Sequence, residues 1–103
     1  MSEFEQVSVV IKANIYFDGN VSSRTIKFAD GSIKTLGVML EGNYHFNTDA
    51  PELMEITQGS IEYRLSENDG WKRIDAGGEF DVPGNSSFDI RALEVSDYIC
   101  SFK

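Results

Sequence analysis

Hydrophobic and polar residues alternate along most of this chain in short segments. Ile61, Tyr63 and Leu65 alternate with polar residues, and the same alternation recurs over 88–92 and 98–102. A period of two is that of a β-strand with one face in the core and one face in water. These segments are therefore predicted to be half-buried strands.

Turn residues separate the alternating segments at intervals of roughly 8–12 residues, which is typical of an all-β sandwich or barrel. Asp30-Gly31 is a favoured hairpin pair, and it predicts a turn between strands over 21–29 and 32–40. Only 51–55 is suited to a helical turn, and no segment has the length of an amphipathic helix. We expect about eight to ten strands in a single domain.

Composition and charge narrow the range of partners. The 103 residues carry 17 acidic and 9 basic side chains, a formal net charge of -8. Such a surface repels nucleic acid and anionic membranes over most of its area. A small anion such as phosphate remains possible, because a few donors in one cleft decide its binding locally.

The location expected from the sequence is the cytoplasm. Cys100 is the single cysteine, so no internal disulfide can form. The first residues lack the basic and apolar regions of a signal peptide. No apolar run approaches the roughly 20 residues that cross a bilayer.

Part of the chain follows the first of two metal-binding motifs of the cupin fold. That motif has two histidines one residue apart, then a glutamate, then six residues and a glycine. Glu52 is followed by six residues and Gly59, while Tyr44 and Phe46 occupy the histidine positions, with a spacer one residue longer than usual. Both of these ligand positions are aromatic.

The second cupin motif is also present without its ligand. Gly77, Pro83 and Gly84 fit its spacing with one residue missing, and Ser87 takes the place of the third histidine. Aromatic rings and one hydroxyl do not replace three imidazoles, so no metal site is predicted. The spacing favours an all-β cupin-type β-barrel, a jelly-roll-like double-stranded β-helix, although any β-barrel turns its corners with glycine and proline.

From residue 14 to 102 the sequence resembles the pyrimidine/purine nucleoside phosphorylase family of small single-domain cupins. The resemblance rests on several blocks that agree in order and spacing: 14–19, 36–39, 42–46, 51–55, 77–84 and 98–100. It implies a cupin domain over 13–103, preceded by an N-terminal extension over 1–12.

The resemblance implies phosphorolysis of both purine and pyrimidine nucleosides. Inorganic phosphate is then the co-substrate, the products are the free base and pentose 1-phosphate, and no cofactor is needed. Relatives of this fold pair as dimers, and edge strands of small barrels are often covered by a partner. We therefore expect a homodimer.

Two acids are candidates for the sugar side of such a site. Glu52 occupies a former ligand position, where a carboxylate pointing inward can accept hydrogen bonds from ribose hydroxyls or oppose a developing cation. Glu55 is the reserve candidate. Both acids can equally be solvated residues near a barrel mouth.

Four aromatic residues are candidates for a wall on which a nucleobase stacks: Tyr44, Phe46, Phe88 and Tyr98. Any base offers a π-face, so stacking fits broad specificity. Tyr44 and Tyr98 carry hydroxyls that need partners when buried, and they join Glu52 as catalytic candidates. The same rings can simply be core, and this alternative stays open.

Phosphate needs cations or clustered donors. Arg24 and Arg91 are the chosen cations, Arg24 because it shares strand parity with Ile26 and Phe28 and is expected to face inward. For Arg91, a solvated surface role stays open as an alternative. Hydroxyl donors are available at positions 23, 35 and 87.

Two reactive side chains are not assigned to catalysis. His45 lies between two inward-facing candidates and is interpreted as a surface histidine on the outer face. Cys100 has the parity of buried neighbours and is interpreted as an inert buried thiol.

Two other functions remain alternatives to a phosphorylase. A non-catalytic cupin binding a nucleoside or sugar would show ligand-induced stabilisation without turnover. A metal-dependent cupin dioxygenase or isomerase would contain stoichiometric metal, and the missing histidines argue against it.

Overall fold

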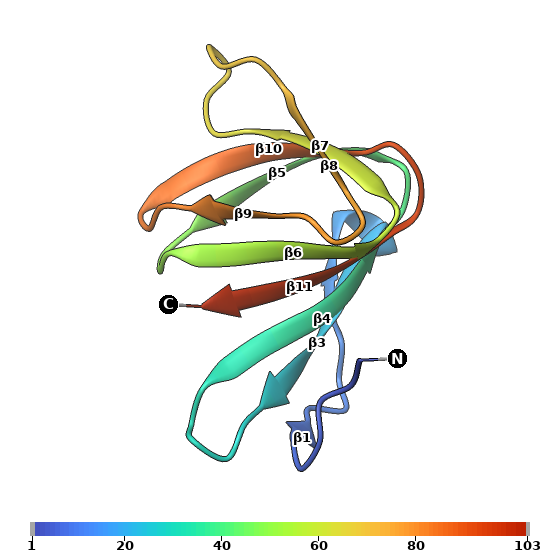
Figure 1. The fold of residues 1–103 in the computed structure, drawn as a ribbon, viewed down its shortest axis with the longest axis vertical. Coiled ribbons are helices and arrows are strands. Elements are labelled where there is room, and N and C mark those ends of the chain that lie inside the picture. The colour runs from blue at the N-terminus through green and yellow to red at the C-terminus, as the bar shows by residue number, and fades with distance from the viewer. Residues whose placement is uncertain (1, 103) are drawn as a thin grey trace.

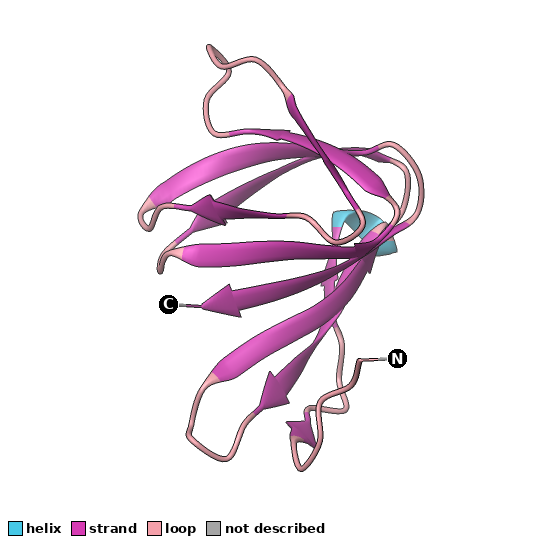
Figure 2. Ribbon diagram, viewed as in Figure 1, coloured by secondary structure: helices cyan, strands magenta, loops and turns pink. Residues whose placement is uncertain are grey.

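The computed structural model describes residues 2–102, and strands form most of this range (Figures 1 and 2). The strands are β1 (Ser8–Val9), β2 (Asn14–Tyr16), β3 (Val21–Lys27), β4 (Ile33–Met39), β5 (Gly42–Thr48), β6 (Glu52–Gln58), β7 (Ser60–Arg64), β8 (Lys72–Asp75), β9 (Glu79–Val82), β10 (Ser86–Ala92) and β11 (Ser96–Phe102). A short 3-10 turn, η1 (Phe17–Gly19), follows β2. The all-β prediction is confirmed.

Two antiparallel sheets make up the domain. Sheet A has the order β1-β3-β4-β11-β6-β9, with β2 also paired to β3, and sheet B has the order β5-β10-β7-β8. Figure 1 shows sheet B above the stacked strands of sheet A. The core joins them, because one cluster of buried side chains includes Met39 and Ile56 from sheet A and Ile61 and Ile90 from sheet B.

The predicted hairpin at Asp30-Gly31 is present between β3 and β4. Gly31 has a φ of 87°, a left-handed conformation that glycine adopts without strain. The Asp30 carboxylate accepts hydrogen bonds from the backbone N–H and the hydroxyl of Ser32. These bonds close the turn and set the register of the two strands.

The helical turn predicted within 51–55 is wrong. This stretch opens β6, which pairs with β11 on one side and β9 on the other. Met54 and Ile56 alternate into the core, so two-sided pairing and burial decide in favour of a strand. The helical turn lies instead at η1, where Phe17 and Asp18 both have positive φ.

The predicted extension over 1–12 includes part of sheet A. Ser8 pairs with Lys27 and Val9 pairs with Ile26, which forms β1 at the edge of the sheet. The ring of Phe4 packs edge-on against Phe28 with a centroid distance of 5.1 Å. The domain boundary at residue 12 stays a prediction.

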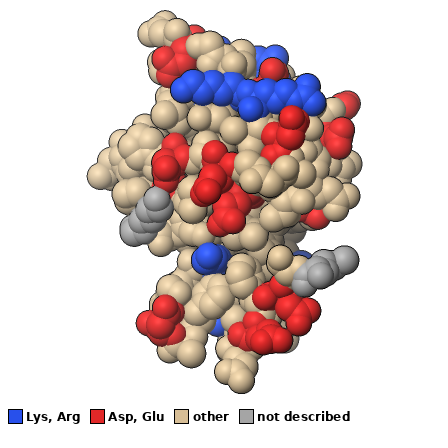
Figure 3. Space-filling model, viewed as in Figure 1, with Lys and Arg blue, Asp and Glu red and all other residues tan. Residues whose placement is uncertain are grey.

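Acidic side chains are spread over the face of the molecule shown in Figure 3, whereas basic ones gather beside the β7–β8 hairpin. The described residues contain no helix with the length and apolar character that a bilayer crossing requires.

Candidate functional site

A cavity of about 170 Å³ lies between the inner faces of the two sheets. Its lining consists of residues from both sheets and from β2: Tyr16, Ser23, Thr35, Met39, Phe46, Asn47, Glu52, Met54, Phe88, Tyr98, Cys100 and Phe102. Tyr16, Asn47 and Phe102 are also exposed, so they mark the mouth. A concave site with few convergent polar groups is the usual form of a small-molecule pocket.

The two walls of the cavity differ in chemistry. Sheet B contributes Phe46 and Phe88, whose rings stack at 5.7 Å with an interplanar angle of 24°. The ring of Tyr16 meets Phe46 edge-on at 5.9 Å. Sheet A contributes most of the polar groups, so the cavity has an aromatic wall opposite a polar wall.

Glu52 is the acid of the polar wall. The Cys100 thiol donates a hydrogen bond of 3.4 Å to its Oε1. Burial raises the pKa of Glu52 above its usual value, and the bond from Cys100 opposes this rise. Burial also raises the pKa of Cys100, which keeps it a thiol and a donor.

Tyr98 is the second polar group, and Gly37 makes its position possible. Tyr98 pairs with Gly37 across the ladder, and a Cβ at Gly37 would lie 2.5 Å from Cζ of the Tyr98 ring. The ring therefore occupies the space that a side chain would fill. Burial raises the pKa of Tyr98, so its hydroxyl stays protonated at neutral pH.

The structure brings four of the predicted site residues together in this cavity: Glu52, Phe46, Phe88 and Tyr98. Two of the hydroxyl donors named from the sequence, Ser23 and Thr35, join them. The expectation for Tyr44 is wrong. Its side chain is buried in the core without lining the cavity, and its hydroxyl donates to the Leu40 carbonyl oxygen at 2.7 Å.

Four other candidates face away from the cavity, which corrects their expected placement. Glu55 and Arg24 alternate with the inward-facing Met54 and Ser23, so both lie on the outer face of sheet A. Arg24 is exposed, and its Nε donates to the Ile11 carbonyl oxygen.

Ser87 and Arg91 lie on the outer face of sheet B, because they alternate with the buried residues Phe88 and Ile90. Arg91 forms an ion pair of 3.5 Å with Glu62, and its guanidinium stacks 3.6 Å above the ring of Trp71. Glu62 and Trp71 thus hold the Arg91 guanidinium on the surface, outside the cavity.

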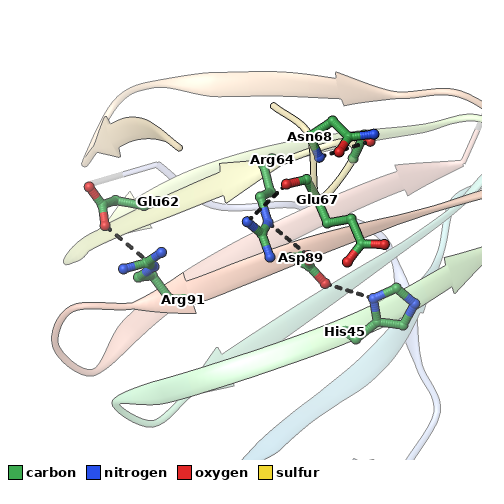
Figure 4. Close-up of polar contacts among 8 residues, drawn as sticks. His45, Glu62, Arg64, Glu67, Asn68, Asp89 and Arg91 are labelled. Carbon is green, nitrogen blue, oxygen red and sulfur yellow. Dashed lines mark hydrogen bonds and ion pairs between the residues drawn. The ribbon is translucent and has the colours of Figure 1, made fainter. Parts of the chain in front are cut away.

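His45 also lies on the outer face of sheet B, as predicted (Figure 4). Its Nδ1 is 2.7 Å from Oδ1 of Asp89, and Arg64 Nε donates to the other carboxylate oxygen at 2.9 Å. These two bonds hold the pKa of Asp89 below its usual value. The histidine thus belongs to a surface polar network, and it is separate from the cavity.

Sequence reasoning missed Tyr16, Asn47 and Phe102 at the mouth and Asn14 behind the polar wall. Asn14 and Tyr16 come from β2, whose three residues are too few to show alternation. Phe102 shares the parity of Tyr98 and Cys100, which was the available signal.

The cupin ligand positions do not fit a metal ion. Tyr44 is bonded to a backbone oxygen, Phe46 has no donor atom and Ser87 points outward. Within residues 2–102, no three His, Cys, Asp or Glu side chains gather in a metal-binding group.

The fold is cupin-like. An RmlC-like cupin from Shewanella frigidimarina superposes with a TM-score of 0.70 at 16% identity, over 98% of this chain and 86% of that one. A protein of unknown function from Acinetobacter sp. ADP1 superposes with a TM-score of 0.94 at 41% identity, over 98% of both chains.

The family follows from sequence similarity. The pyrimidine/purine nucleoside phosphorylase family model matches residues 11–102. Proteins of that name are 57% identical in Cupriavidus metallidurans (99% of both chains) and 52% identical in Geobacter sulfurreducens (99% of this chain and 98% of that protein), each over 102 residues. The chain belongs to the pyrimidine/purine nucleoside phosphorylase family, which confirms the resemblance noted in the sequence.

Proposed function

We propose that this protein catalyses the phosphorolysis of purine and pyrimidine nucleosides in the cavity between its sheets. A phosphate oxygen forms a bond to the anomeric carbon, the bond from that carbon to the base nitrogen breaks, and the base leaves with the electron pair and takes up a proton. Family membership and the opposition of an aromatic wall to a polar wall support this proposal.

The arrangement of the walls orients the substrate. The base stacks near Phe46 and Phe88, where the contact is to a π-face that every base possesses, and this accounts for broad specificity. The sugar then faces Glu52 and Tyr98. The Glu52 carboxylate opposes the positive charge that develops on the ring, and the Tyr98 hydroxyl donates a hydrogen bond to a substrate oxygen.

Phosphate binding in this proposal relies on neutral donors. Among residues 2–102, no lysine or arginine lines the cavity, whereas the Tyr98 hydroxyl and the Asn47 side-chain amide do. Positioning and electrostatics supply the acceleration, with no covalent intermediate and no metal.

The test is release of base from uridine or adenosine, with and without inorganic phosphate. We expect phosphate-dependent release, unchanged by a chelator, and a loss of about 100-fold in kcat/KM for Glu52→Gln. Glu55→Gln is the matched control, since this acid lies three residues away on the opposite face, and it is expected to keep full activity.

Three outcomes would overturn the proposal. Binding of nucleoside with thermal stabilisation but no turnover would support a non-catalytic cupin. Release at the same rate without phosphate would indicate hydrolysis. An equal loss of kcat/KM in Glu52→Gln and Glu55→Gln would show that the reaction does not take place in the cavity.

We further infer a cytoplasmic homodimer. The outer face of sheet A exposes Leu36 and Val38 of β4, at 38% and 39%, where a second copy can cover them. Sedimentation at working concentration is expected to give twice the 11.5 kDa mass of one chain, and a monomer would contradict the assembly.

A further inference from the structure

A chain of hydrogen bonds runs behind the polar wall and ends at Tyr98. It begins at Asn14, the first residue of β2, which pairs with Ser23 of β3. The Asn14 side-chain amide donates to the hydroxyl oxygens of Ser23 at 3.2 Å and Thr25 at 3.3 Å. An NH₂ group only donates, so the Ser23 hydrogen has to find its acceptor elsewhere.

The geometry points to the Tyr98 oxygen as that acceptor. Ser23 and Tyr98 both pair with Gly37, one from each side, so their side chains meet over the glycine on the inner face. The Tyr98 ring lies over Gly37, with its Cζ 2.5 Å from where a Cβ of that residue would be, and both side chains are buried, Ser23 at 4% and Tyr98 at 7% exposure. A hydrogen bond from Ser23 opposes the rise that burial causes in the pKa of Tyr98. Because Ser23 donates its hydrogen, the hydrogen of Tyr98 is left for another acceptor.

We infer that Asn14 is a positioning residue: through Ser23 it fixes the Tyr98 hydroxyl as a donor directed into the cavity. The group it meets is an oxygen acceptor of the substrate, belonging to either the sugar or the phosphate. This inference rests on the proposed function only in assuming that the cavity binds these substrates. Donors oriented before binding strengthen an interaction because no reorganisation follows.

Asn14→Asp reverses the chain while keeping the size of the side chain. A carboxylate accepts the Ser23 hydrogen, Ser23 then accepts from Tyr98, and the Tyr98 hydrogen turns away from the cavity. The measurement is calorimetric binding of uridine without phosphate and of phosphate without nucleoside, so that neither arm involves turnover.

We expect Asn14→Asp to weaken the affinity for one of the two ligands about tenfold or more and to change the affinity for the other by no more than about twofold. The ligand whose affinity falls is the one that accepts the hydrogen bond from Tyr98. In a Tyr98→Phe background, Asn14→Asp is expected to cause no further loss. Thr25→Val, which removes the other partner of Asn14, is the control and is expected to bind both ligands normally.

Ser23→Ala provides a second variant if Asn14→Asp fails to fold, and it is expected to weaken the same ligand as Tyr98→Phe. The inference is overturned if the wild type binds a ligand but Asn14→Asp or Ser23→Ala leaves both affinities unchanged. It is also overturned if Asn14→Asp weakens binding equally in the wild-type and Tyr98→Phe backgrounds. An equal loss of affinity in Thr25→Val would overturn it as well. Failure of the wild type to bind either ligand would instead reject the proposed function.

Discussion

At the scale of single residues, the site depends on a position without a side chain. Gly37 lies between Ser23 and Tyr98 in the ladder, and the Tyr98 ring fills the space above it. Tyr98 thereby stays buried with its hydroxyl at the cavity. The role of Gly37 is one of close approach, since its conformation is not left-handed.

Gly37→Ala tests this dependence. The added methyl group would lie 2.5 Å from the Tyr98 ring and from the Ser22 carbonyl oxygen, so the strands or the ring must shift. We expect a loss of about 1–3 kcal/mol in the free energy of unfolding, measured in urea, together with lower activity. At Gly70 a Cβ meets nothing within 4 Å, so Gly70→Ala is the control. Equal stability of the two variants would contradict the account.

The pKa of Glu52 makes a second prediction at this scale. Activity requires the ionised form of Glu52. Because the pKa is raised, activity is expected to be lost on acidification at a higher pH than if Glu52 had the pKa of an ordinary glutamate. Because the folded state binds this proton more tightly than the unfolded chain, stability decreases as pH rises from 4.5 through the raised pKa.

Urea unfolding of wild type and Glu52→Gln at both ends of this range measures the stability effect. Glu52→Gln is expected to be the more stable protein above the raised pKa and equal to wild type below 4.5. A variant that is destabilised equally at both pH values would contradict the burial argument.

At the scale of elements, strand alternation explains both what the sequence predicted and where it failed. It placed Phe88 and Tyr98 correctly on inner faces. It failed at Arg24 because the reference residue Ile26, although only 3% exposed, lies on the outer face beside the N-terminal segment. The N-terminal segment buries Ile26 on the outer face, and the alternation within β3 alone does not reveal such burial.

The predicted role of Tyr44 failed for a different reason. Its inward orientation was right, but the ring of Phe17 packs 5.0 Å from it, and Leu40 takes its hydroxyl hydrogen. Both contacts come from segments that flank the barrel strands. A motif position alone therefore did not decide between core and cavity.

The β7–β8 hairpin has its own stabilising contacts on the outer face of sheet B. The ring of Trp71 receives Arg91 at 3.6 Å and Arg64 at 4.5 Å. Trp71→Ala is expected to cost about 1–2 kcal/mol of stability in thermal unfolding. Base release per folded molecule is expected to stay within about twofold, because this face is remote from the cavity; a loss comparable to that of Glu52→Gln would refute this separation.

At the scale of the whole molecule, the two-sheet fold assembles a site from segments far apart in the sequence. Asn14, Ser23, Glu52 and Tyr98 come from β2, β3, β6 and β11. The cupin spacing predicted the fold and Glu52 at a ligand position, but the chain from Asn14 through Ser23 to Tyr98 depends on how β2, β3, β4 and β11 pair. Such pairing lies beyond what a single sequence pattern specifies.

The central claim is that one cavity holds the nucleoside between an aromatic and a polar wall. A crystal structure with uridine bound in the absence of phosphate tests it most directly. We predict the base against Phe46 and Phe88, with sugar hydroxyls within hydrogen-bond distance of Glu52 or Tyr98. Uridine bound elsewhere, for example on the outer face around His45, with the cavity free of ligand, would contradict the account.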